Sequence, residues 1–325
     1  MANYHPNFPL SLSISPNVIS QLAPCVSFQD HICTRNTFGI AAQRDAIQKY
    51  GIAGRVWEAA LAMCEYIDYS GSPLLEFDPP FFECEEADSE PPVLIELGSG
   101  TGIVAARIAG SAYFPEGGIV VATDLLDVCP LLEHNLGSIF SLPTDSERSR
   151  VLVRPLAWGN MGHATAIAQE LGIPHTRTLT HIICSDLVYF PELFGPLLRT
   201  LIHLTSLPCP SADAGKSIKI VISYKVRSLH KESPFWSAFG LWFTFQPVLF
   251  QDKDGESWSQ FGAMDDDTQD RTFIFIAYRR PESLAWEVPL SDRDLVDGVG
   301  GRGTPARKGD DTFETLLFLA MKIVE

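Results

Sequence analysis

The sequence lacks the features that mark secreted and membrane proteins. Its seven cysteines are scattered and never follow the C-x-x-C spacing of a zinc site or redox motif. This odd, dispersed set argues against a disulfide framework and favours a reducing compartment. No run of eighteen apolar residues occurs, and residues 1–24 contain no basic segment followed by an apolar one. We therefore expect a cytoplasmic protein, with the nucleus as a second compartment, and no association with a membrane.

Basic residues are also scarce. The 325 residues contain 24 Lys and Arg against 40 Asp and Glu, which gives a formal net charge of −16. Because phosphate backbones repel such a protein, we expect no nucleic-acid partner; a basic protein or an amine is more natural. Hydrophobic residues make up 46% of the chain, which is the composition of a globular protein with a sizeable core. We expect a monomer that holds no metal ion.

Composition divides the chain into three parts. Residues 1–34 are rich in Pro, Ser and Asn and show little periodicity, which is typical of an extended arm. Residues 35–280 carry regular apolar patterns and predict one domain, in which the acidic, proline-rich segment 71–92 is expected to be a solvated loop. Residues 281–325 form a C-terminal extension, in which a long loop precedes a predicted helix over 313–324.

The centre of the domain alternates between strand and helix patterns. Short runs of Val, Ile and Leu are followed by segments whose apolar residues recur at helical spacing. Alternation at this pitch predicts parallel strands joined by helices. The predicted strands of this kind cover residues 93–97, 118–124, 151–156, 180–185 and 218–224.

Two further segments complete the predicted sheet. Residues 242–250 and 272–278 are β-rich and are separated by an acidic, turn-forming stretch, which predicts an antiparallel hairpin. An amphipathic helix is predicted over 54–67, before the first strand. We therefore predict an α/β, Rossmann-like fold whose seven-stranded sheet is mostly parallel, with an antiparallel C-terminal hairpin and helices on both faces.

The most informative segment is the glycine-rich turn after the first predicted strand, Gly98-Ser99-Gly100-Thr101-Gly102. Glycines at such a turn allow a tight bend and a close approach of the backbone to a ligand. The G-x-x-x-x-G-K-[ST] pattern of P-loop proteins is absent, and the dinucleotide pattern G-x-G-x-x-G would need glycine where Ile103 stands. The spacing found is E-x-G-x-G-x-G, beginning at Glu96.

Two carboxylates accompany this turn. Glu96 ends the first strand, where it is suited to accept hydrogen bonds from an ammonium group, which S-adenosylmethionine (SAM) has and NAD lacks. Asp124 ends the second strand, where an acidic residue binds ribose hydroxyls; Asp127 is a weaker candidate that is better suited to cap a helix. A turn without any ligand is the alternative, but the coincidence of these features favours a SAM site.

A second cluster lies at the end of the fourth predicted strand, with Ser185, Asp186 and Tyr189. An acidic residue three positions before an aromatic one repeats the spacing of the D/N-P-P-Y/F motif of amine methyltransferases. In that motif the polar side chain holds the amine and the ring packs against it. The alternative is that Asp186 caps the following helix and that Tyr189 belongs to the core.

The sequence as a whole resembles the family-16 class I methyltransferases, a group dominated by protein-lysine methyltransferases. Five motifs occur in the family's order over about residues 50 to 280: the V-W-D-A-A helix, the E-L-G-x-G-T-G turn, the acid of the second strand, L-x-W-G and D-x-x-Y. Glu58 replaces the usual Asp of the first motif. Ser185 stands where a small apolar residue is commoner. The acidic insertion before the first strand and the C-terminal tail are also atypical.

The resemblance implies a set of site residues. The helix tryptophan, Trp57, would border the cofactor, and the tryptophan of L-x-W-G, Trp158, would lie beside the adenine. Asp186 would orient the acceptor amine, and Tyr189 would shape its channel. The cofactor-binding set implied is Trp57, Glu96, Gly98, Ser99, Gly100, Thr101, Gly102, Asp124, Leu125, Asn135, Trp158 and Ser185.

The function expected from these observations is SAM-dependent N-methylation of a lysine side chain in a cytosolic protein. Methyl transfer of this kind requires neither a metal nor a covalent enzyme intermediate. A small-molecule N- or O-methyltransferase on the same fold is the first alternative. A NAD-dependent oxidoreductase and an inactive binding module are more distant ones.

Overall fold

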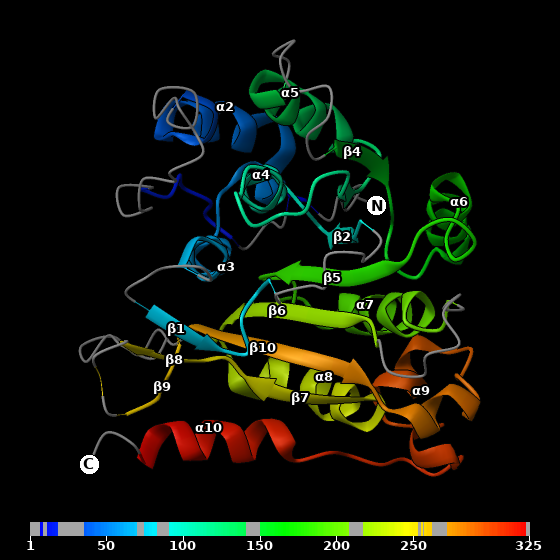
Figure 1. Cartoon of the computed structure of the whole chain (residues 1–325). Helices are drawn as coiled ribbons and strands as arrows, with labels where there is room; N and C mark the ends of the chain where they lie inside the picture. Colours follow the sequence, from blue (N-terminus) through cyan, green and yellow to red (C-terminus); the bar gives the residue numbers. More distant parts are fainter. Residues whose placement is uncertain are drawn as a thin grey trace.

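The computed structural model describes residues 7–8, 12–18, 36–69, 75–82, 91–140, 150–207, 217–252, 255, 257–261 and 272–322 (Figure 1). A seven-stranded sheet with the order β4-β3-β2-β5-β6-β10-β7 forms its centre. Five strands are parallel, namely β2 (Val93–Leu97), β3 (Ile119–Asp124), β4 (Arg150–Pro155), β5 (Leu179–Ser185) and β6 (Lys219–Lys225). The strand β10 (Thr272–Arg279) runs antiparallel to both β6 and β7 (Phe243–Pro247). The predicted fold class is confirmed.

The strand order places a topological switch point at the centre of the sheet. From β2 the chain moves outward through β3 and β4, and then returns to the other side of β2 with β5 and β6. The connections on the two sides therefore diverge at the carboxyl ends of β2 and β5. In open α/β sheets, ligands bind in the crevice that such a point leaves.

Helices cover both faces of the sheet and create two cores. Along β2, Val93, Ile95 and Leu97 face one core, to which α6 (Met161–Leu171), α7 (Pro191–Leu204) and α8 (Leu229–Trp242) contribute. Leu94 faces the other core, made with α3 (Glu58–Tyr69), α4 (Ile103–Ala109) and α5 (Cys129–Phe140). Because successive strand residues point to opposite faces and both are covered, β2 is buried at every position. Among the described residues, no helix is long and apolar enough to cross a membrane.

Among the described residues of the predicted domain 35–280, two α-helices are not predicted by the pattern of apolar residues, for different reasons. In α2 (Ile40–Tyr50) the buried side chain is that of Gln43, so no apolar stripe reveals the helix. The helix α8 is buried around most of its circumference and carries a proline, Pro234, in its first turns, so its apolar residues show little helical periodicity. The predicted helix over 54–67 corresponds to α3, which begins later, after a short 3₁₀ helix η1 (Gly51–Gly54).

The prediction of a solvated loop over 71–92 is wrong for residues 75–82. Here β1 (Leu75–Asp78) pairs with β8 (Leu249–Asp252), and β9 (Ser259–Gln260) completes a second, three-stranded sheet. Phe77 and Phe81 are buried, with their rings 5.3 and 5.5 Å from that of Tyr66. A strand partner far along the chain creates this order, which the local composition does not reveal. Residues 71–74 and 83–90 lie outside the described part.

The C-terminal extension is also more ordered than predicted. Residues 281–311, expected to be a loop, contain η2 (Pro281–Ala285), α9 (Asp292–Val296) and η3 (Gly301–Gly303). The predicted final helix is present as α10 (Thr312–Lys322). Leu295 and Phe313 are fully buried, and Phe313 stacks on Trp236 of α8 with ring centroids 4.8 Å apart. A few apolar anchors in a polar segment therefore tie the extension to the main core.

The N-terminal arm is held by the side chain of Gln43. Its oxygen accepts hydrogen bonds from the backbone N–H groups of Asn17 (2.9 Å) and Val56 (3.1 Å). Its nitrogen donates to the carbonyl oxygens of Asn17 (3.0 Å) and Phe38 (2.8 Å). Gln43 is 1% exposed, so one buried amide joins the arm, α2 and the segment before α3.

Gln43→Leu should lower the free energy of unfolding by about 2 to 3 kcal/mol, because it leaves buried backbone groups without partners. Chemical denaturation measures the change. Gln48→Leu is the matched control, since Gln48 is exposed on the same helix and its replacement should change stability by less than about 0.5 kcal/mol. Equal effects of the two substitutions would contradict the anchoring role.

Candidate active site

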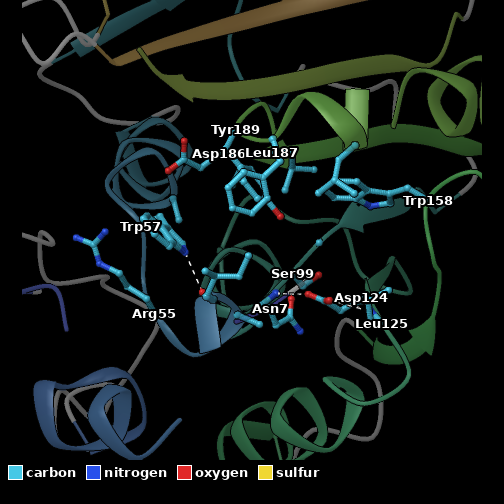
Figure 2. A pocket seen from close by; sticks show the side chains of 18 of the residues that line it. Asn7, Arg55, Trp57, Ser99, Asp124, Leu125, Trp158, Asp186, Leu187 and Tyr189 are labelled. Atoms are coloured by element: carbon cyan, nitrogen blue, oxygen red, sulfur yellow. Dashed lines mark hydrogen bonds between the residues drawn. The ribbon is translucent and has the colours of Figure 1, made fainter. Parts of the chain in front are cut away.

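A cavity of about 420 Å³ opens at the carboxyl ends of the central strands (Figure 2). The predicted site residues other than Gly102 and Asn135 line it: Trp57, Glu96, Gly98, Ser99, Gly100, Thr101, Asp124, Leu125, Trp158, Ser185, Asp186 and Tyr189. Its position is the one that the switch point of the sheet favours. The structure therefore brings together residues that span more than a hundred positions of the chain.

The glycine turn forms one wall of the cavity through its backbone. Gly98 and Gly100 have φ angles of 59° and 53°, in the left-handed region that favours glycine. A Cβ atom on Gly98 would lie 2.8 Å from a methyl carbon of Leu187, and one on Gly100 would lie 3.0 Å from the carbonyl oxygen of Ala53. Side chains at these positions would strain the turn and narrow the cavity, so both glycines are structurally required.

The two carboxylates of the turn are buried. Glu96 accepts a hydrogen bond from the N–H of Ala105 (3.1 Å), and burial raises its pKa to about 8. Asp124 accepts hydrogen bonds from the N–H groups of Gly100 (2.8 Å) and Leu125 (2.7 Å), yet burial still raises its pKa to about 6. This end of the cavity therefore combines two acids whose ionisation a ligand cation or hydroxyl groups would favour.

Gly102 and Asn135, both predicted to bind the cofactor, support the turn from behind. Gly102 caps α4 with a φ of 81°, and a Cβ there would meet Leu132 at 3.0 Å, on the core side. The Asn135 side chain donates a hydrogen bond of 2.9 Å to the carbonyl oxygen of Thr101. Because neither residue lines the cavity, this geometry gives them a supporting position.

Asp186 and Tyr189 lie at the other end of the cavity. Asp186 has a φ of 63°, and its N–H donates to the carbonyl oxygen of Ser223 (2.8 Å), which turns the chain sharply at the end of β5. A left-handed aspartate is uncommon and often marks a functional site. The residue at the N-cap of α7 is Phe190, so Asp186 is not the cap of that helix. The ring of Tyr189 packs against that of Phe190 with centroids 4.7 Å apart.

Arg227, which the motif analysis missed, binds Asp186. Its Nη1 atom donates to Asp186 Oδ1 at 2.6 Å, and its Nη2 atom donates to Oδ2. The guanidinium carbon also lies 5.4 Å from the centre of the Trp57 ring, and that of Arg55 lies 4.3 Å from it. The Trp57 indole N–H donates to the carbonyl oxygen of Ile52 (3.0 Å), which fixes the ring at the cavity wall.

The N-terminal arm also reaches this cavity. Asn7 is buried and lines it near Ser99 and Asp124 (Figure 2). The carbonyl oxygen of Asn7 accepts a hydrogen bond from the N–H of Ile52 (2.9 Å). No motif signals either Arg227 or Asn7, because each reaches the site from a segment without a recognisable pattern.

Comparison with known proteins agrees with this geometry. A sequence model of the lysine methyltransferase family matches residues 37–239, which is more than half of the chain. The chain belongs to the lysine methyltransferase family. The resemblance seen in five ordered motifs is thereby confirmed.

Three relatives of this lysine methyltransferase family member illustrate its similarity. It is 31% identical over 180 residues to protein-lysine N-methyltransferase EFM6 of Saccharomyces cerevisiae, covering 54% of this chain and 65% of that protein. It is 29% identical over 188 residues to EEF1A lysine methyltransferase 3 of Mus musculus, covering 58% and 62%. It is 28% identical over 205 residues to protein N-lysine methyltransferase METTL21A of Xenopus tropicalis, covering 62% and 74%. The chain thus spans less than two thirds of the length of the first two relatives.

The Ser185 hydroxyl of this family member is placed to receive a ligand. Its oxygen is buried and has no hydrogen-bond partner among the described residues, although the residue lines the cavity. Buried hydroxyls normally find a partner.

Within the described residues, no cluster of three or more His, Cys, Asp or Glu is arranged to hold a metal ion.

Ser185→Ala should therefore change the free energy of unfolding by less than about 0.5 kcal/mol, because no hydrogen bond within the protein is lost. Thr123→Val is the matched comparison: the Thr123 hydroxyl donates to the carbonyl oxygen of Glu96 (2.7 Å) in a fully buried site. Its loss should cost about 1 kcal/mol or more. Urea denaturation of both variants checks the difference, and an equally large effect of Ser185→Ala would show an internal partner.

Proposed function

We propose that this protein transfers a methyl group from SAM to the side-chain amine of a lysine in a protein. The observation that carries the proposal is one continuous cavity with two chemically distinct ends. One end is built from the glycine turn and Asp124, and the other from Asp186 and Tyr189. Membership of the family and the activities for which the three relatives are named support a protein lysine as the acceptor.

The residues present suit SAM at the first end. Glu96 is a buried carboxylate that an ammonium group would pair with, and Asp124 offers oxygen atoms to hydroxyl groups at the tip of β3. Because Gly98 and Gly100 have no side chains, their backbone atoms are exposed to the cavity. The Ser185 hydroxyl has no hydrogen-bond partner among the described residues and can bind one on the ligand. When bound, SAM supplies an activated methyl group on a positively charged sulfur.

At the second end, the protein's task is to align a neutral amine and to exclude water. A lysine side chain has a reference pKa near 10.4, so its deprotonation at pH 7 costs about 4 to 5 kcal/mol in water. Asp186 is positioned to accept a hydrogen bond from the amine. The Tyr189 ring forms part of the wall past which the aliphatic chain would pass.

Incubation of the protein with radiolabelled SAM and a cell lysate tests the proposal. We expect the label in a protein band, with methyllysine found after hydrolysis. Asp186→Ala should retain SAM binding by calorimetry but lose labelling by about a hundredfold, because the acceptor is no longer held. Label confined to the small-molecule fraction would favour a small-molecule methyltransferase, and the absence of SAM binding would overturn the whole proposal.

The affinity for SAM should increase as the pH rises from 6 to 7.5, and Glu96 alone should contribute up to about tenfold per pH unit. Burial raises the pKa of Glu96 to about 8, so the carboxyl is protonated at pH 6 and must release its proton to pair with an ammonium. An α-amino group, with a reference pKa of about 7.7 to 8.0, stays mostly protonated over this range. Calorimetry in buffers of different ionisation enthalpy measures both affinity and proton release.

Glu96→Gln is the control for this pH dependence. The variant should bind SAM more weakly and with a smaller slope, to which Asp124, with its pKa of about 6, still contributes. An unchanged slope would remove Glu96 from recognition of the ammonium group.

The cytoplasmic location, the monomeric state and the absence of nucleic-acid and membrane partners stay predictions.

A further inference from the structure

The carboxylate proposed to receive the acceptor amine already has a strong cationic partner. The Asp186 side chain is 2% exposed, and both of its oxygens accept hydrogen bonds from the guanidinium of Arg227, which is 30% exposed. Both residues line the cavity. An amine that reaches Asp186 must therefore enter beside Arg227.

Arg227 is held in this orientation by its surroundings. The Nη1 atom of Arg227 also donates to the carbonyl oxygen of Lys225 (3.2 Å). The backbone N–H of Arg227 donates to the carboxylate of Glu232 (3.3 Å). Glu232 is buried and also accepts hydrogen bonds from the Ser228 N–H (3.0 Å) and the Tyr224 hydroxyl. These hydrogen bonds hold the backbone and the side chain of Arg227, so its guanidinium is kept in place beside Asp186.

The other charged groups around Arg227 do not replace Asp186 as its partner. Glu58 attracts Arg227 electrostatically but forms its own ion pair with Arg55 at 2.6 Å. Lys231 lines the same cavity and adds positive charge, as does Arg55. Among the described residues that line this end of the cavity, Tyr189 adds a further titratable group, its phenol.

We propose that Arg227 is a positioning residue that holds Asp186 in a charge-neutralised ion pair, so that the site binds the acceptor lysine as the neutral amine. The inference rests on the proposed function. An unpaired buried carboxylate would favour the ammonium form of the lysine, which has no lone pair to react. The ion pair with Arg227 keeps hydrogen-bond acceptors in place but removes that preference, since the added positive charge opposes a second cation.

The reaction balances in two steps. The lysine ammonium first releases a proton to solvent. The nitrogen lone pair then forms the new N–C bond as the C–S bond breaks, and the sulfur retains the electron pair of that bond. Because the first step must precede the second, any group that stabilises the ammonium slows transfer at neutral pH.

Arg227→Met tests the inference through the pH profile of methyl transfer into the labelled lysate protein. In the variant, the carboxylate of Asp186 has lost its cationic partner and should favour the ammonium form of the acceptor lysine. The midpoint of the kcat profile should move upward by about 1 to 3 pH units. At pH 7.5, kcat should fall by about tenfold or more and recover at high pH, while KM stays the same or decreases.

Three variants serve as controls. Arg227→Lys keeps the charge and should restore the midpoint close to that of the original protein. The double variant Asp186→Asn/Arg227→Met removes both charges and should also return the midpoint toward it, at a lower rate. Arg199→Met breaks an ion pair with Asp292 outside the cavity and should leave the profile unchanged.

Thermal unfolding and SAM affinity establish that each variant folds. An Arg227→Met variant that is folded and binds SAM, yet shows the same pH midpoint as the original protein, would overturn the inference alone. Failure of the original protein to methylate any lysine would overturn the proposed function, and this inference with it. An upward shift in Arg227→Met that Arg227→Lys reverses would support it.

Discussion

The site depends on the hydrogen bonds that join the glycine turn to the tip of β3. The Ser99 N–H donates to the carbonyl oxygen of Thr123 (2.8 Å), and the Thr123 N–H donates back to the Ser99 hydroxyl oxygen (3.0 Å). The Gly100 N–H donates to Asp124. These contacts fix the left-handed glycines beside a buried carboxylate. They also satisfy backbone groups that would otherwise be costly to bury.

The acidic residues at the two ends of the cavity differ in their ion pairing. At the glycine turn, Glu96 and Asp124 are buried acids for which the described residues provide no cationic partner, and burial raises the pKa of each. At the tip of β5, Asp186 is bound by Arg227. An arrangement of this kind suits a positively charged cofactor at one end and an uncharged nucleophile at the other. The electrostatics of the two ends thereby support the proposal that they bind different ligands.

Segments outside the central sheet complete the site. The N-terminal arm brings Asn7 to the cavity, and the buried amide of Gln43 ties the arm to α2. On the other side, the C-terminal extension packs Phe313 against α8, the helix that carries Glu232. Because Glu232 in turn binds the backbone of Arg227, packing outside the cavity lining supports the geometry at Asp186. The N-terminal arm and the C-terminal extension are therefore part of the site's framework.

The sequence by itself determined the features that are encoded locally. The alternation of strand and helix patterns predicts the sheet, since a parallel strand buried on both faces is a short continuous apolar run. The turn from Gly98 to Gly102 is recognisable because the strand before it, which contains Glu96, and the helix after it are contiguous with it in the sequence. Asp124 is recognisable because it follows at the spacing that the family has. The cavity at this turn lies where those patterns place it.

Only the tertiary structure decided the contacts between distant segments. Asp186 and Arg227 are 41 residues apart, and no local pattern marks an arginine that reaches the site from the loop after β6. The strand β1 in the acidic segment depends on its pairing with β8, and the order of residues 281–311 depends on a few anchors in the core. Composition measures what a segment is made of, whereas burial depends on which other segment covers it. For that reason the charge state of the acceptor end became visible only in the folded chain.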